Sequence, residues 1–363
     1  MRGAFKLGNV AGIGIYIHWT FAILIIFIIF SNYQSGSNTQ QIAWAVLFVL
    51  SIFVTVFLHE LGHALAAKRY NIKTKDITML PIGGLARLES IPEKPFEELV
   101  VAIAGPAVNI ALALFTGLFI TLPNTEVLVA ELSNGVNAHN FFLNFLVVNV
   151  WLALFNLIPA FPMDGGRVLR ALLAMKFERH IATNIAARIG QLLAIGFIFL
   201  GFYGNPMLIF IGFFIFLGAQ AEAQMVQTKS MLTGYTVKNA LIQQYQTIEA
   251  TEPVSTAVHL LLNSQYKTFL VTQNSYPVGT LNRDDIIRAL SQKGDAEPVA
   301  FVMDTNLVYI DAHLPLEEAY QQMQQQQANF VLVKENDHFV GIIDNENILE
   351  FILVKSALAQ KRG

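Results

Sequence analysis

The chain has 363 residues, of which 54% are hydrophobic and only 13% are charged, and its formal net charge is −3. Polar side chains are too few to cover a soluble globule of this size, so the composition indicates a membrane protein. Cysteine is absent, which excludes disulfide bonds and thiolate metal sites. The net charge itself says nothing about partners; we expect a lipid bilayer, and no nucleic acid, among them.

Long segments without Asp, Glu, Lys or Arg support this conclusion, and they cover residues 7–58, 99–125, 132–163 and 189–221. Each segment is long enough for at least one spanning helix of about 20 residues. The polar turn "SNYQSGSNTQQ" divides the first segment, and "YGNP" divides the last. The sequence therefore predicts six transmembrane helices, at 13–31, 42–67, 97–122, 139–161, 186–203 and 206–224.

The basic residues indicate how these helices are oriented, because cytoplasmic loops are enriched in Lys and Arg. Arg2 and Lys6 precede the first predicted helix, and the loops after the second and fourth helices are also basic. The three intervening loops have neither Lys nor Arg. We therefore expect a multi-pass protein of the cell membrane with both termini in the cytoplasm. The first apolar segment lacks a convincing cleavage site, so we expect no cleaved signal peptide.

Residues beyond 230 are polar, rich in Gln and internally repeated. Residues 252–290 align with 314–352, so that Gly279 corresponds to Gly341. Each copy predicts a β-α-β-β-α module. We therefore expect a transmembrane domain at 1–228 and a soluble α/β domain at 229–363, with modules at about 232–292 and 294–354.

The repeat resembles a tandem pair of CBS domains, a family in which many members bind adenine nucleotides. In that family the last helix often begins with an Asp that holds the ribose. Asp285 occupies this place in the first copy, whereas the second copy has Asn347. Binding of ATP or AMP near Asp285 and a role in packing or homodimer formation stay open as alternatives.

The apolar segment "FVTVFLHELGHALAAKRY" at 53–70 carries the clearest chemical signal. In the pattern H-E-x-x-H, positions i and i+4 lie on one face of a helix, so His59 and His63 can bind one Zn²⁺ while Glu60 acts as general base. The alternative is a chance match, with histidines that are satisfied core residues. Ionisable groups inside a span cost about 2.5 kcal/mol or more each, which favours a functional cavity.

A catalytic zinc needs a third protein ligand. Asp164 follows the fourth predicted helix in "NLIPAFPMDGGR", on the same cytoplasmic side as both histidines. Gly165 and Gly166 permit close approach of the backbone, and the prolines end the helix. The alternative is a plain helix-ending turn, in which Asp and Gly are common. Beside an intramembrane "HELGH", the ligand interpretation is favoured.

Three motifs together resemble the site-2 protease family of intramembrane zinc metalloproteases. They are "HELGH" in the second predicted span, "GPAVN" at 105–109 in the third and "NLIPAFPMDGGR" in the fourth. Residues 1 to about 225 carry this resemblance, and the added CBS pair is similar to one bacterial and archaeal branch. Met163 stands where the family usually has Leu, a swap of similar volume.

The resemblance implies an endopeptidase with one Zn²⁺ per chain, which cuts within or near the transmembrane segments of other proteins. His59, His63 and Asp164 would hold the ion, and Glu60 would activate water. The expected substrates are membrane-spanning regulators, sigma-factor precursors or proteins of the anti-sigma type. Substrate contacts are expected at Asn109, Asn156, Pro159, Gly83 and Gly84. For Asn156 the alternative is a hydrogen bond between helices. For Asn109 the alternative is a helix kink at "GPxxN" that makes room for the catalytic helix.

Between the second and third predicted helices, "TKDITMLPIGGLARLES" at 74–90 predicts a β-hairpin beside the active site. A substrate helix must unwind before it is cut, and an exposed strand edge offers its backbone new partners. We therefore expect residues 82–85 to hold the substrate in extended form. The predicted fold is a membrane all-α domain of six transmembrane helices with this small β-hairpin, followed by a soluble α/β tandem CBS domain.

An alternative function is an ion channel or transporter gated by the cytoplasmic CBS pair. Such a protein would need acidic groups or discontinuous helices at a pore near the middle of the bilayer. The ionisable cluster in this sequence instead resembles a zinc site and lies near one membrane face. The protease interpretation is therefore favoured.

Overall fold

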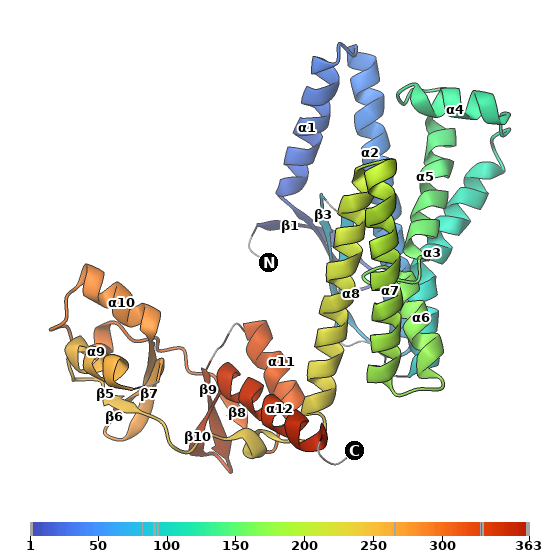
Figure 1. Ribbon diagram of the computed structural model, residues 1–363. Coiled ribbons are helices and arrows are strands. Elements are labelled where there is room, and N and C mark those ends of the chain that lie inside the picture. Colours follow the sequence, from blue (N-terminus) through green and yellow to red (C-terminus); the bar gives the residue numbers. More distant parts are fainter. Residues whose placement is uncertain are drawn as a thin grey trace. The chain divides into compact units, whose positions relative to one another are not determined.

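A computed structural model describes residues 3–81, 83–89, 92, 94–264, 266–326, 328 and 330–360. The chain divides into two compact units, 1–226 and 227–363. The boundary between them falls inside a single long helix, α8 (Met207–Leu232). Each unit is described by itself below (Figure 1).

The N-terminal unit is mostly helical. Four of the described helices are long and apolar enough to cross a membrane: α2 (Thr39–Arg69), α3 (Pro95–Gly117), α7 (Arg179–Tyr203) and α8. Two further apolar helices are shorter, α1 (Thr20–Gln34) and α5 (Phe141–Asn156). Two helices were not predicted from the sequence: α4 (Thr125–Ser133) and α6 (Asp164–Ala174).

A four-stranded sheet lies against α2 in this unit, in the order β1-β2-β3-β4. Its strands are β1 (Ala4–Val10), β2 (Ile13–His18), β3 (Thr74–Leu80) and β4 (Gly83–Leu88). Strands β3 and β4 form an antiparallel pair within the segment where the sequence predicts a hairpin. The other two strands were not predicted, and β2 joins β3 in parallel.

The predicted start of the first helix at residue 13 is wrong, because residues 13–18 form β2 and the helix begins at Thr20. The sequence "IGIYIH" has isoleucine at every second position, the period of a strand with one buried face. Ile13 and Ile17 accordingly pack with Ile77 of β3 and with Ala64 of α2. In a long uncharged run this short alternation is hidden by the high hydropathy.

Helices α2 and α3 approach each other closely through small residues. A Cβ atom on Gly62 of α2 would lie only 2.9 Å from the carbonyl oxygen of Ala104 on α3. Small residues at such crossings let two membrane helices pack at short range. The crossing brings the "GPAVN" segment of α3 against the "HELGH" segment of α2, and this contact builds the site described below.

The C-terminal unit contains two β-α-β-β-α modules, as the repeat predicts. The first has β5 (Thr247–Glu249), α9 (Val254–Asn263), β6 (Thr268–Gln273), β7 (Tyr276–Asn282) and α10 (Arg283–Gln292). The second has β8 (Tyr309–Asp311), α11 (Leu316–Gln326), β9 (Phe330–Glu335), β10 (His338–Asp344) and α12 (Asn345–Gln360). Each module has one three-stranded sheet, ordered β5-β6-β7 or β10-β9-β8. Short 3₁₀ helices at Val237–Ala240 and Val299–Phe301 precede the first strand of each module.

The two modules exchange short segments. Ile242, which precedes the first module, pairs with Ile342 of the second, and Asp304, which precedes the second, pairs with Thr280 of the first. The close approach at Ile242 requires a glycine, because a Cβ atom on Gly341 would lie 2.5 Å from the Ile242 carbonyl oxygen. The reciprocal pairing ties both modules into one unit.

Candidate active site

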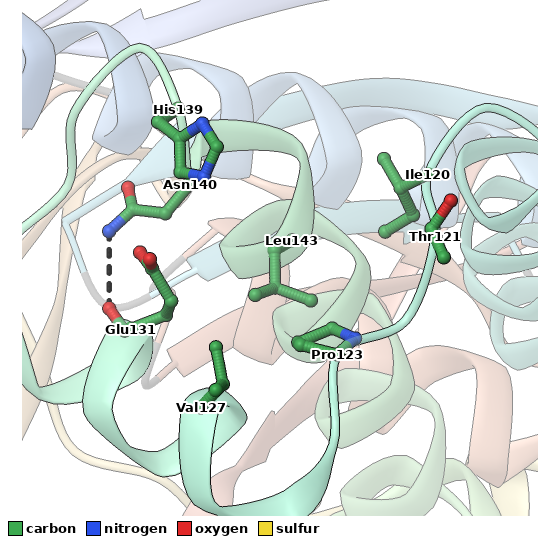
Figure 2. A pocket seen from close by; sticks show the side chains of 8 residues that line it. All are labelled: Ile120, Thr121, Pro123, Val127, Glu131, His139, Asn140 and Leu143. Carbon is green, nitrogen blue, oxygen red and sulfur yellow. Dashed lines mark hydrogen bonds between the residues drawn. The ribbon is translucent and has the colours of Figure 1, made fainter.

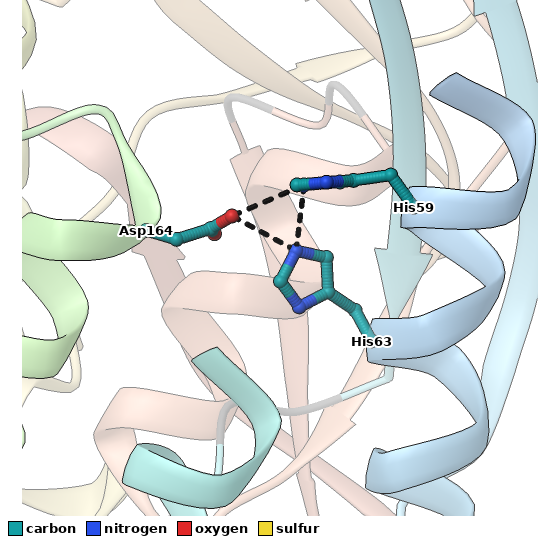
Figure 3. A group of neighbouring side chains, drawn as sticks. All are labelled: His59, His63 and Asp164. Carbon is teal, nitrogen blue, oxygen red and sulfur yellow. Dashed lines mark hydrogen bonds and ion pairs between the residues drawn. The ribbon is translucent and has the colours of Figure 1, made fainter. Parts of the chain in front are cut away.

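Two histidines lie on one face of α2. This helix begins with a capping box, in which the Asn38 side chain accepts from the Gln41 backbone and the Gln41 side chain accepts from the Asn38 backbone. His59 and His63 follow in the apolar part of the helix and are 7% and 6% exposed. Figure 3 shows both rings projecting from α2 toward a single carboxylate on another helix.

That carboxylate belongs to Asp164, the first residue of α6. Its Oδ2 atom lies 3.1 Å from His59 Nε2 and 3.0 Å from His63 Nε2. The chain before Asp164 folds back over the start of α6, where a Cβ atom on Gly165 would lie 2.2 Å from the Ile158 carbonyl oxygen. The "DGG" sequence is therefore required for the turn that points the carboxylate toward the histidines.

The three ligand atoms fit a zinc ion in chemistry and spacing. Two imidazole nitrogens and one carboxylate oxygen are common Zn²⁺ ligands, and a tetrahedral ion with bonds of about 2.0–2.1 Å separates its ligands by about 3.3–3.4 Å. The two Nε2 atoms here are 3.1 Å apart, so the group needs to widen only slightly. Among the described residues, these three are the group whose side chains could hold a metal.

Gly105 of α3 keeps the space beside these atoms open. A Cβ atom at this position would lie 2.2 Å from His63 Nε2 and 2.6 Å from His59 Nε2. No side chain, however small, fits there without displacing the rings. The glycine of "GPAVN" therefore leaves a cradle beside the Nε2 atoms of both histidines, which any side chain at this position would fill.

The outer nitrogens of both rings are held by α3. His63 Nδ1 lies 2.7 Å from the backbone oxygen of Val101, and His59 Nδ1 lies 2.5 Å from Oδ1 of Asn109. A backbone carbonyl only accepts, so His63 carries a proton on Nδ1, which leaves Nε2 as the ring atom that can bind a metal. Such outer contacts orient metal-binding histidines in general.

Glu60 lies beside the two histidines on α2 and is held by the edge of the sheet. Its Oε2 atom accepts a hydrogen bond of 3.2 Å from the backbone N–H of Ala86 on β4. Gly84 makes room for it, because a Cβ atom there would lie 2.6 Å from Glu60 Cγ. The backbone of strand β4 therefore holds in place a carboxylate that projects from α2.

The residues predicted to contact substrate have different surroundings in the structure. Asn109 is fully buried and bonded to His59, so its amide serves the histidine in this structure. Asn156 is half-buried and donates to the Leu152 carbonyl oxygen of its own helix, while Pro159 is exposed. Gly83 has a φ of +140° at the start of β4. Ile82, which the sequence places in the substrate clamp, lies outside the described residues.

A buried ion cluster near Asp164 was missed by sequence reasoning. Arg170 of α6 lies in the segment that the sequence predicts to be a basic loop after the fourth helix, yet its side chain is 0% exposed. Its Nε donates to Glu98 on α3 at 2.8 Å, its Nη1 donates to Glu222 on α8, and Arg179 of α7 pairs with Glu98 at 3.2 Å. The signal was present, because Glu98 and Glu222 lie inside predicted spans, where an acid needs a partner.

A separate cavity of about 260 Å³ is lined by the segment that follows α3, by α4 and by the start of α5, and by none of the three residues of the histidine cluster. Figure 2 shows the Asn140 side chain beside it, which donates to the backbone oxygen of Glu131 at 3.1 Å. Asn140 is buried and also bonds to the loop before α5. The polar groups of Asn140 at this cavity thus hold the connection between α4 and α5.

Comparisons with known proteins agree with this geometry. Residues 47–200 match Peptidase family M50, and residues 237–292 and 299–354 each match a CBS domain. A zinc metalloprotease of Methanocaldococcus jannaschii is 32% identical over 85% of this chain and 87% of its own length. A Synechocystis protein with a zinc metalloprotease name is 28% identical over 98% of this chain and 97% of its own length.

Among solved structures, the site-2 protease of Methanocaldococcus jannaschii is 37% identical to this chain. The match covers 61% of this chain and 95% of that one, with a TM-score of 0.43. The sequence matches extend across both the "HELGH" region and the CBS pair. The chain therefore belongs to Peptidase family M50, the site-2 proteases, and is a zinc metalloprotease with a tandem CBS domain.

Proposed function

We propose that this protein hydrolyses peptide bonds within or near the transmembrane segments of other proteins, with His59, His63 and Asp164 as its zinc ligands and Glu60 as its general base. The observation that carries this proposal is the convergence of three ligand atoms from segments about a hundred residues apart, at 3.0 to 3.1 Å. The family assignment replaces the alternative of a channel or transporter gated by the CBS pair.

The residues of the chain divide the chemistry between them. Zn²⁺ held by His59, His63 and Asp164 would supply Lewis-acid activation of a water molecule at neutral pH. Glu60 would accept a proton from the water as its oxygen bonds to the peptide carbonyl carbon, and would return that proton to the nitrogen as the C–N bond breaks. The Ala86 N–H keeps one Glu60 oxygen in place during this transfer. The low exposure of both histidines keeps bulk water from the ligands.

Two substitutions test this assignment. Glu60→Gln removes the base while leaving the three ligands, so we expect zinc content to stay at the wild-type level and cleavage to fall by about 10²- to 10⁴-fold. Asp164→Ala removes a ligand, so we expect zinc to be lost as well. Zinc analysis and cleavage of a single-span reporter substrate measure both effects. Full cleavage by the Glu60 variant, or full zinc content in the Asp164 variant, would remove that residue from the proposed site.

For the membrane arrangement, we propose six spans with both termini in the cytoplasm. The four long helices account for four spans, and α1 and α5, of 15 and 16 residues, would supply the other two. At 1.5 Å per residue these helices reach about 22–24 Å, short of a 30 Å hydrocarbon core, so they need a locally thin bilayer. We propose that the transmembrane domain ends at residue 228, inside α8, and that the soluble domain begins at residue 229. Reporter fusions at the two termini test this topology.

Substrate binding would use the outer edge of β4. Within the described residues β4 is the last strand of its sheet, and the Ala86 N–H points outward to Glu60. Backbone groups alternate along a strand, so Gly84 also presents its groups at this edge. An unwound substrate could therefore add as a further strand beside Glu60.

Cysteine cross-linking tests this arrangement, because the natural chain has no cysteine. Leu85→Cys, at a 41% exposed position of β4, is paired with single cysteines along a substrate segment. A strand predicts disulfides at every second substrate position. Leu118→Cys, at an 80% exposed position beyond α3, serves as control. Disulfides at every third or fourth position, or equal yields from both variants, would contradict strand addition.

The CBS pair would bind ATP or AMP through its first module. Asp285 lies in the first turn of α10, where its carboxylate caps the Asn282 backbone and pairs with Arg288. The second module has Asn347 at the same place. Calorimetric titration of the full-length protein with ATP and AMP tests this, with Asp285→Ala as the variant that should not bind. A flat trace for the wild type would leave packing, or homodimer formation, as the role of the pair.

A further inference from the structure

Two buried asparagines connect His59 to a backbone carbonyl on another helix. Asn109 of α3 and Asn149 of α5 are 0% and 1% exposed, in helices that are otherwise largely apolar. Oδ1 of Asn109 lies 2.5 Å from His59 Nδ1, and its Nδ2 donates to Asn149 Oδ1 at 3.3 Å. Nδ2 of Asn149 donates to the Phe145 carbonyl oxygen at 2.9 Å. The three contacts form one chain that ends at the active site.

The carbonyl at the far end of this series of hydrogen bonds determines which atoms donate and which accept. The Phe145 carbonyl can only accept, so Asn149 must present its NH₂ group to it and its oxygen to Asn109. Asn109 must then donate through its own NH₂ group, which leaves its oxygen to face His59. His59 therefore carries a proton on Nδ1, which leaves Nε2, the atom nearest Asp164, as the one that can bind a metal. Each amide atom of Asn109 and Asn149 that takes part in these hydrogen bonds therefore has a single role, as donor or as acceptor.

We infer that Asn149, acting through Asn109, is a positioning residue that fixes the tautomer and ring orientation of His59 for metal binding. The inference rests on the proposed zinc site, to which it adds two residues. His63 is oriented in a single step by the Val101 backbone, which no substitution can remove. His59 depends instead on two side chains, so this half of the site can be altered by mutation without touching a ligand.

A purely structural role for the two asparagines makes a different prediction. A hydrogen bond between membrane helices stabilises their packing by about 0.6–2 kcal/mol. Loss of that bond alone would lower the unfolding temperature and leave the zinc affinity of folded protein unchanged. Loss of the relay, meaning the hydrogen bonds from Asn149 through Asn109 to His59, would lower zinc affinity in protein that is still folded. Outer contacts of this kind change metal affinity by about 10- to 100-fold.

The experiment measures zinc affinity by chelator competition on the full-length protein in detergent, together with the visible spectrum of the Co²⁺-substituted form. Asn109→Leu and Asn149→Leu should each bind zinc about 10- to 100-fold more weakly and shift the Co²⁺ bands. Asn109→Asp loses the donation to Asn149 but has two equivalent oxygens, so it needs no partner to turn an acceptor toward His59 Nδ1. Its zinc affinity should stay within a few-fold of wild type. A carboxylate commonly holds a zinc-bound histidine in this way.

Asn144→Leu is the matched control. Asn144 lies on the same helix as Asn149, is partly buried and donates to the carbonyl oxygen four residues before it, at 2.9 Å. In the part of the chain that the structure describes, Asn144 makes no hydrogen bond to His59, so the Asn144→Leu variant should bind zinc like wild type. Should Asn149→Leu fail to fold, Asn149→Ala breaks the same contact with a smaller side chain and is measured in its place.

The outcomes separate the two proposals. A wild-type protein without zinc would overturn the proposed metal site itself. A wild-type protein with zinc, beside an Asn149 variant whose affinity and Co²⁺ spectrum equal those of the Asn144 control, would overturn the relay and leave the metal site standing. Weak binding by Asn109→Asp equal to that of Asn109→Leu would also overturn it, because the acceptor would then be irrelevant.

Discussion

The two units of the chain bury different kinds of side chain. Among the residues that the structure describes, every buried polar or charged side chain lies in the N-terminal unit except Thr272. The cores of the two CBS modules are aliphatic and aromatic, with residues such as Val254, Phe269 and Ile343 at 0% exposure. Burying polar groups costs free energy unless they are well paired, so the N-terminal unit retains them for a purpose that hydrophobic packing cannot serve.

That purpose differs from one buried group to another. The two histidines and Asp164 bring together three atoms that could hold a metal, and Asn109 contacts the ring of His59. Arg170 instead joins α6 to α3 and α8. The comparison teaches that a substitution in the N-terminal unit is expected to change chemistry or helix placement, whereas one in the C-terminal core changes stability alone. Four predictions test this difference, beginning with the largest effect.

Gly105→Ala should weaken zinc binding by about 100-fold, because the new methyl group would collide with both Nε2 atoms. Gly196→Ala is the control, since Gly196 lies in α7 with open space around its Cβ position. Chelator competition measures both affinities. Wild-type affinity in the Gly105 variant would show that the rings can move aside and that the cradle is not needed.

Arg170→Met should lower the free energy of unfolding of the N-terminal unit by about 3–5 kcal/mol, because it leaves the buried carboxylate of Glu98 without its main partner. The exposed pair of Lys94 with Glu97 serves as control, and Lys94→Met should cost less than about 1 kcal/mol. Tryptophan fluorescence follows this unfolding, since Trp19, Trp44 and Trp151 all lie in the N-terminal unit. Equal effects of the two substitutions would mean that the cluster is not a helix anchor.

Phe269→Ala should destabilise the first CBS module by about 3–5 kcal/mol while leaving zinc content unchanged, because it creates a cavity in an apolar core. Leu262→Ala on the same module is the control, at 78% exposure, and should change stability by less than about 0.5 kcal/mol. Hydrogen exchange of peptides from β6 and β7 in the full-length protein measures both. Loss of zinc from the Phe269 variant would break the distinction between the two units.

The smallest effect concerns the N-terminal caps of α10 and α12. Asn and Asp stand in opposite order in the two caps: Asn282 and Asp285 in the first module, Asp344 and Asn347 in the second. Burial raises the pKa of the Asp344 carboxyl above its ordinary value. Ionisation therefore costs stability as the pH rises through this raised pKa, and below the ordinary pKa of about 3.9 there is no such cost.

Asp344→Asn removes that cost and keeps the acceptor for the Asn347 N–H. We expect the variant to be more stable than wild type at pH 7, by less than about 1 kcal/mol because solvent screens a half-buried group. The advantage should shrink as the pH falls toward 4. Hydrogen exchange of peptides from α12 at the two pH values measures it. Lower stability of the variant at pH 7 would show that the cap needs the charge.

Local patterns gave the sequence its predictive power. The spacing of His59 and His63 is set by one helical turn, and Asp164 is predicted as a ligand because it follows the fourth predicted helix on the same cytoplasmic side as both histidines. The structure brings these three together as expected. The repeat in the C-terminal unit was equally visible, since aligned glycines and apolar runs mark equivalent strands.

The remaining features depend on contacts that no local pattern records. Strand β2 lies in an uncharged run, where an apolar strand and an apolar helix have similar hydropathy. The bond from Asn109 to His59 joins residues 50 positions apart, and that from Arg170 to Glu98 joins residues 72 apart. Only the packing of α2, α3 and α6 brings these groups within reach, so their roles follow from the fold.

The absence of a side chain at Gly105 gives a rule for deciding whether other chains of this family can bind zinc. A relative that keeps both imidazoles and the aspartate but has alanine at this point would be a pseudoenzyme despite its intact ligand set. Loss of catalysis in this fold can thus originate in a residue that has no functional group at all. A search for inactive members should therefore inspect this position before the motif that names the family.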